Sequence, residues 1–121
     1  MRILLATNNL ELGFLRAKVL ESVGHRVDMG SNDQQRLALI ASRTYELLLA
    51  CHSLSENSCE TISAAFRSAN PDGHVVGILK RDFDDDTCGR QQFDVSVSGI
   101  SGPGALLNAV RHVGTQSAGS A

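Results

Sequence analysis

The chain has 121 residues, of which 42% are hydrophobic and 20% charged, values typical of one folded globular domain. With 11 basic and 13 acidic residues its net charge is −2, and it contains no Trp, so direct nucleic-acid binding through charge or base stacking is not expected. No apolar run approaches the roughly 18 residues of a membrane span, and the apolar start ends at Asn8, too early for a secretory signal.

The chain has three cysteines, Cys51, Cys59 and Cys88, an odd number without a CxxC pair. This number and spacing fit neither a disulfide framework nor a common zinc site. The prediction is three reduced thiols in a cytoplasmic protein.

The first elements alternate between strand and helix. Arg2–Ala6 is a short apolar run typical of a strand buried on both faces. Residues 9–23 show helical spacing, and Gly24 follows as a helix-ending residue. Residues 25–29 alternate as a half-exposed strand does. The apolar positions predicted to form the inner face of this first helix are Leu12, Leu15, Val19 and Val23.

A capping-box pattern of Ser31 with Gln34 predicts the start of a second helix. Its predicted inner face comprises Leu37, Ile40 and Ala41. Tyr45–Cys51 is the most apolar run and predicts the central strand. After a polar turn at 52–57, a third helix is predicted with Cys59, Ile62, Ala65 and Phe66 on its inner face.

Turn residues at 70–73 precede His74–Leu79, a fourth buried strand. A weak helical pattern over 82–92 leads to a fifth strand, Phe93–Val97. Pro103 near the first position predicts a last helix from Gly102, with Leu106, Leu107, Val110 and Val113 facing inward. Residues 114–121 lack periodicity and predict a flexible tail or the start of a linker.

Five strands interleaved with five helices predict an α/β domain over residues 1–113, with a doubly wound, five-stranded parallel sheet. In such a sheet, ligands bind beyond the carboxyl ends of the strands. The residues to inspect therefore directly follow each strand.

Four stretches, MRILLATNN, LESVGHRVDMGSN, YELLLACHSL and GPGALLNAVRHV, together resemble a bacterial response-regulator receiver domain. The resemblance covers residues 1–113 and implies the flavodoxin-like (βα)5 fold and a place in two-component or phosphorelay signal transduction.

Receivers carry an acidic pair after the first strand, which holds Mg²⁺, and a phosphoacceptor Asp at the end of the third. The resemblance places Asn8 and Asn9 at the acidic pair and Cys51 at the phosphoacceptor. It places Leu79 or Lys80 at the Ser/Thr switch position, Ser96 at the aromatic switch position and Gly99 at the conserved Lys. Each functional position departs from the receiver pattern, so this resemblance implies a degenerate, atypical receiver.

Phosphoryl transfer to an aspartate needs a carboxylate nucleophile and a divalent cation held by anionic oxygens. Asn8, Asn9 and Cys51 supply neither, so no catalytic residue, metal or cofactor is expected. The sequence instead predicts a phosphorylation-independent module for protein interaction or dimerisation, with an output domain expected after Ala121. Charged residues before the last helix, Arg81, Asp85 and Arg90, mark the expected interaction face for a partner protein or a second copy.

Two other interpretations use the same residues. A small-molecule sensor on the same fold is one, although the first glycine after the first strand is Gly13 and no glycine-rich phosphate loop is present. The other is an enzyme, because LATNN resembles the opening of the inosine-triphosphate pyrophosphatase family. The Gly-Lys step of that family is replaced here by Leu10 and Glu11.

Overall fold

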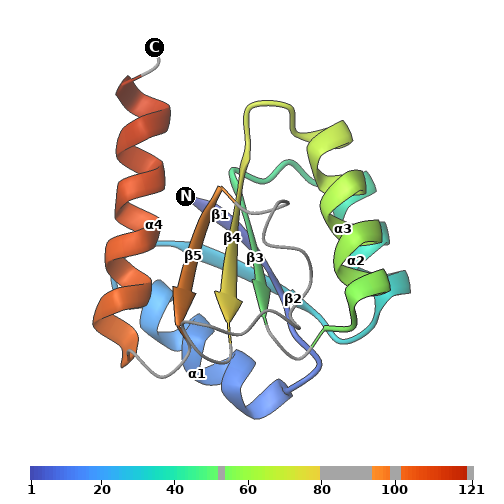
Figure 1. The fold of residues 1–121 in the computed structure, drawn as a ribbon, viewed down its shortest axis with the longest axis horizontal. Coiled ribbons are helices and arrows are strands. Elements are labelled where there is room, and N and C mark those ends of the chain that lie inside the picture. The colour runs from blue at the N-terminus through green and yellow to red at the C-terminus, as the bar shows by residue number, and fades with distance from the viewer. Residues whose placement is uncertain (52–53, 80–93, 99–101, 120–121) are drawn as a thin grey trace.

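The computed structural model describes residues 1–51, 54–79, 94–98 and 102–119. Within these ranges, five parallel strands form one sheet in the order β2-β1-β3-β4-β5 (Figure 1). The strands are β1 (Arg2–Ala6), β2 (Arg26–Gly30), β3 (Leu47–Cys51), β4 (His74–Leu79) and β5 (Val95–Ser98). The helices are α1 (Leu10–Glu21), α2 (Asp33–Ser42), α3 (Glu56–Ala69) and α4 (Gly102–Gly119). The predicted doubly wound parallel fold is confirmed.

The sheet is covered on both faces. Helices α1 and α4 lie against one face, and α2 and α3 against the other (Figure 1). Because neighbouring side chains of a strand point to opposite faces, Leu48 packs under α2 and α3 while Leu49 packs under α1 and α4. This two-sided burial is why the central strands are continuous apolar runs rather than alternating ones.

The inner face of α1 differs from the prediction. Leu15 is 63% exposed and Val23 55%, whereas Gly13 and Leu20 are buried and Ala17 packs against the core. The helix lies so close to the sheet that a Cβ on Gly13 would be 2.6 Å from the Met29 sulfur. Because a side chain at position 13 would not fit at this distance, the face of α1 that carries Gly13 is the one that packs against the sheet.

The inner face of α2 also differs. Arg36 and Ile40 are buried, and Leu37 is at the surface. The helix is capped by Asn32 rather than by Ser31: the Asn32 side chain accepts a hydrogen bond from Gln35 N. The Gln35 side chain in turn accepts from Ser31 N, the residue before the cap, so the helix start is closed by Asn32 and Gln35 rather than by the predicted pair of Ser31 and Gln34.

The other helices agree better with the sequence pattern. In α3, the fully buried residues are Cys59, Ile62 and Phe66. In α4, Val110 is fully buried and Leu106 is nearly so. However, α4 continues to Gly119 and therefore runs through residues expected to begin a tail. The helix predicted over 82–92 lies outside the described residues.

Two local predictions have definite outcomes. Gly24 has a φ of +97°, the left-handed conformation expected of a residue that ends a helix. Cys59 is disulfide-bonded, so the prediction of a reduced thiol is wrong at this residue. An odd number of cysteines does not exclude a disulfide at one of them, and the spacing alone could not reveal it. Cys88 lies outside the described residues. Cys51 is a free thiol.

Candidate functional site

Polar side chains gather where the first three strands of the chain end. Thr7 and Asn8 follow β1, Gly30 ends β2 and Cys51 ends β3. Because these strands are parallel and adjacent, their carboxyl ends meet at one edge of the sheet, where ligands bind in this class of fold. We call this region the carboxyl edge.

Asn9 is committed to the start of α1. Its side-chain Oδ1 accepts a hydrogen bond of 3.2 Å from Leu12 N, so Asn9 is the N-cap of this helix. Thr7 supports the same turn, because its Oγ1 accepts from Asn9 N at 3.0 Å. Asn9 Oδ1 is thus already engaged in capping α1.

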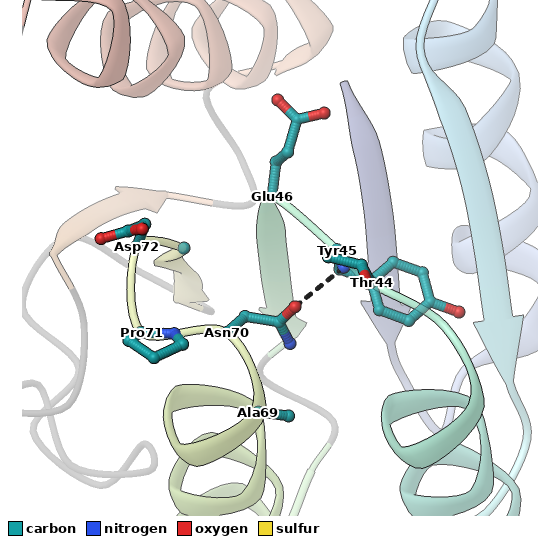
Figure 2. Close-up of a pocket in the computed structure, with 8 residues that line it drawn as sticks. Thr44, Tyr45, Glu46, Ala69, Asn70, Pro71 and Asp72 are labelled. Atoms are coloured by element: carbon teal, nitrogen blue, oxygen red, sulfur yellow. Dashed lines mark hydrogen bonds between the residues drawn. The ribbon is translucent and has the colours of Figure 1, made fainter. Parts of the chain in front are cut away.

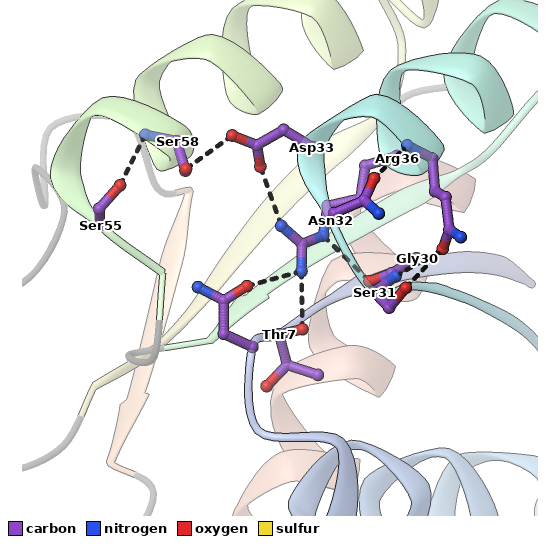
Figure 3. Close-up of polar contacts among 10 residues, drawn as sticks. Thr7, Gly30, Ser31, Asn32, Asp33, Arg36, Ser55 and Ser58 are labelled. Atoms are coloured by element: carbon purple, nitrogen blue, oxygen red, sulfur yellow. Dashed lines mark hydrogen bonds and ion pairs between the residues drawn. The ribbon is translucent and has the colours of Figure 1, made fainter.

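Arg36 occupies the centre of the carboxyl edge, with its side chain only 1% exposed (Figure 3). Its Nη2 donates to Thr7 O at 2.7 Å and to Asn8 Oδ1 at 3.0 Å. Its Nε donates to Gly30 O at 3.1 Å. The guanidinium therefore joins the ends of β1 and β2, and Asn8 is bound to a cation of the protein itself.

Asp33 is the anionic partner of this arginine. Its Oδ1 accepts from Arg36 Nη1 at 2.9 Å, and its Oδ2 accepts from Ser58 Oγ at 2.7 Å (Figure 3). Ser58 lies in the first turn of α3, where its backbone N donates to the capping Ser55. The carboxylate thus links α2 to α3, with both of its oxygens engaged.

Cys51 lies at the end of β3 with a residue exposure of 2%. Burial raises the pKa of its thiol, although the positive charges of the Arg16 and Arg36 guanidinium groups oppose that rise. The thiol is therefore protonated at neutral pH and is a poor nucleophile.

A cavity of about 370 Å³ lies at the opposite, amino end of the strands (Figure 2). It is lined by the residues that precede β3 and β4, Thr44–Glu46 and 69–73. In its wall, Asn70 Oδ1 accepts from Tyr45 N at 3.0 Å and Asn70 Nδ2 donates to Phe66 O at 3.3 Å. Asn70 therefore closes the turn after α3, which is a structural role.

No family model matches the chain, and no curated protein matches its sequence. Among solved structures, a CheY-like receiver domain from Methanospirillum hungatei aligns with 99% of this chain and 98% of its own, at a TM-score of 0.81 and 16% identity. The chain has the fold of a response-regulator receiver domain.

Two further receiver-fold structures are similar at 93% coverage of this chain and 97% of their own. The response regulator TrrA from Thermotoga maritima, in complex with Mg²⁺ and BeF, has a TM-score of 0.76 and 18% identity. The receiver domain of a sensor histidine kinase from Pseudomonas aeruginosa, with a magnesium ion coordinated in its active-site cleft, has a TM-score of 0.76 and 16% identity.

The carboxyl edge of this chain does not fit a magnesium ion. Asn8 Oδ1 is hydrogen-bonded to the Arg36 cation, Asn9 Oδ1 caps α1, and Cys51 presents a buried, protonated thiol. Mg²⁺ requires accessible hard oxygen ligands, preferably anionic ones. Among the described residues, no three His, Cys, Asp or Glu side chains gather where they could hold a metal ion.

The structure brings three of the predicted site residues, Asn8, Asn9 and Cys51, to this edge. Leu79 ends β4 and pairs in register with Ser98, and Ser96 lies in β5 beside Gly77. The remaining predicted positions, Lys80, Arg81, Asp85, Arg90 and Gly99, lie outside the described residues.

Arg36, Asp33 and Ser58 were missed by the sequence analysis. One signal was present: Arg36 lies four residues before the buried Ile40, a spacing that places both on one face of a helix. In the described ranges, none of the helices combines the length and apolar character that a bilayer crossing requires.

Proposed function

We propose that this chain is an atypical receiver domain of a two-component-type regulator that works without phosphorylation, as a protein-interaction module. The observation that carries the proposal is the hydrogen bond between Asn8 Oδ1 and Arg36 Nη2. In the receiver pattern an acidic side chain for Mg²⁺ stands at this position, whereas here a neutral amide binds a buried cation. The buried thiol of Cys51, at the phosphoacceptor position, supports the same conclusion.

Exposure to Mg²⁺ and a phosphodonor tests this proposal. A ligand at ten times its Kd stabilises a folded domain by about 1.4 kcal/mol, or about 4–8 °C in melting temperature. We expect no such rise in millimolar Mg²⁺, because Asp33, the carboxylate that the described residues place at this edge, is already bonded to Arg36 and Ser58. We also expect no phosphoryl adduct after incubation with acetyl phosphate, measured by intact mass.

The variant Cys51→Asp sharpens the test. It restores a carboxylate at the phosphoacceptor position but leaves Asn8 bound to Arg36, so it too should remain unmodified. A stable phosphoryl adduct on the unmodified chain, or a clear rise in its melting temperature with Mg²⁺, would contradict the proposal.

For the partner, we propose the surface formed by β5 and α4, with Arg81, Asp85 and Arg90, which lie outside the described residues, as its expected charged contacts. Helix α4 packs beside β5, and this end of the sheet lies opposite β2 (Figure 1). A face rich in charge suits salt-dependent pairing with a second copy or docking of a partner protein. An output domain following Ala121 is part of this proposal.

Sedimentation at micromolar concentration measures the pairing. Arg90→Glu and Asp85→Lys should each weaken it, and added salt should do the same. Arg26→Glu, on the exposed edge strand β2, and Asp72→Lys, in the exposed turn before β4, are charge-matched controls that should leave it unchanged. A monomer at every concentration would contradict self-association and leave docking of a different protein.

A further inference from the structure

We propose that the Arg36 guanidinium is a built-in cation, which fills a cation site of four oxygens and holds the carboxyl edge in one arrangement without a metal ion. This inference rests on the proposed function and deepens it, because it names the group that takes the place of a metal ion at that site.

The four oxygens converge on one side chain from three segments. Thr7 O and Asn8 Oδ1 come from the end of β1, and Gly30 O comes from the end of β2. Asp33 Oδ1 comes from the first turn of α2. Their distances to the guanidinium nitrogens range from 2.7 Å to 3.1 Å, all within good hydrogen-bond geometry.

The charges also match. Three of the oxygens belong to neutral groups and one to a carboxylate, so the set carries one negative charge for one guanidinium. A divalent ion in the same place would leave a buried excess of positive charge, which is strongly unfavourable. Asp33 cannot compensate further, because its carboxylate carries a single negative charge, which already pairs with Arg36.

A tethered cation has a consequence that a bound ion lacks. It cannot dissociate, so the links from Asp33 to Ser58 and from Arg36 to Thr7 persist at any metal concentration. The ends of β1 and β2 and the starts of α2 and α3 are therefore held together permanently.

The test restores the acidic pair with and without the arginine. In Asn8→Asp/Asn9→Asp, the first new carboxylate faces Arg36 and the second can still cap α1, since Asp caps as well as Asn. We expect this variant to bind no Mg²⁺ by calorimetry, because Arg36 pairs with the carboxylate. Adding Arg36→Gln should free that carboxylate, and Mg²⁺ should then raise the melting temperature by about 4–8 °C near saturation.

Equal Mg²⁺ affinity with and without Arg36 would overturn the inference, as would a folded triple variant that binds no Mg²⁺. Both results concern restored carboxylates. The proposed function is contradicted by a different result, a response of the unmodified chain to Mg²⁺ or acetyl phosphate. The two failures are therefore distinguishable.

A measurement on the unmodified chain covers the case in which the triple variant does not fold. Nitrogen-15 NMR should show Arg36 Nη protons that exchange slowly with water and rotate slowly, unchanged by millimolar Mg²⁺ or by a chelator. Arg43, whose exposed side chain pairs with Asp28 at 3.1 Å, is the control and should exchange fast. Arg36 signals as mobile as those of Arg43 would overturn the inference.

Discussion

A buried arginine is costly unless each charged and polar group around it is satisfied. Arg36 meets this condition through oxygens of four residues, whereas Arg43 pairs with Asp28 near the surface, where an ion pair contributes little. The two arginines lie close in sequence and belong to very different environments. Only the buried one fixes how strands and helices meet.

At Cys51, burial should control both reactivity and the pH dependence of stability. We expect slow alkylation by iodoacetamide in the native state and fast alkylation in denaturant, because thiolate is the reactive form and the folded protein disfavours it. Because the pKa of Cys51 is raised in the folded state, the contribution of this thiol to the free energy of unfolding is fully present below the pKa that it has in the unfolded state. It is lost as pH rises above about 8.5, where the unfolded thiol ionises.

Denaturant unfolding between about pH 7 and 9 measures this loss, and Cys51→Ala should remove it. Tyr45, whose hydroxyl donates to Asp28 at 2.8 Å, also has a raised pKa, so the comparison stays below the range in which an unfolded tyrosine ionises. Rapid, selective alkylation of native Cys51 would show a reactive thiol and contradict the expectation.

At the scale of elements, two helical glycines should respond oppositely to alanine. At Gly13 of α1 a Cβ would be 2.6 Å from Met29 Sδ and 2.7 Å from Thr7 Cγ2, so Gly13→Ala should destabilise the domain by about 1–3 kcal/mol. At Gly104 of α4 a Cβ meets nothing within 4 Å, so Gly104→Ala should stabilise it by about 0.5–1 kcal/mol. Urea unfolding of both variants checks this, and equal effects would contradict close packing of α1.

The strands were the most predictable elements. The bounds of β1 and β4 agree with their apolar runs, because burial on both faces leaves an unbroken signal. Helix α1 was predicted as an element but with the wrong inner face. A glycine in close contact with a sheet carries no apolar signal, so periodicity favoured Leu15 over Gly13.

The site was less predictable than the fold. The cap at Asn9 could be predicted, because it depends on a neighbouring residue. The contact between Arg36 and Thr7 joins residues 29 positions apart in the sequence, and the spacing of Arg36 to Ile40 gives its helix face but not this partner. Local patterns report local contacts, whereas this site is made of distant ones.

For the whole molecule, the sheet divides the interior into two cores, and neighbouring residues test each of them. Leu48→Ala and Leu49→Ala remove fully buried side chains from opposite faces of β3, and each should cost about 2–5 kcal/mol by urea unfolding. Phe14→Ala is the control, since its 60% exposed ring should cost within about 0.5 kcal/mol. A small loss at either leucine would contradict two-sided burial.

The place of β1 between β2 and β3 has a consequence for how the chain folds. Leu4 pairs with Asp28 on one side and with Leu48 on the other, so both edges of β1 are closed only by segments that come later in the chain. Each closure requires a loop to form before the contacts that stabilise it, which slows folding in parallel sheets. During synthesis, the second edge of β1 therefore stays uncovered until β3 has been made. Aggregation competes with folding during that interval.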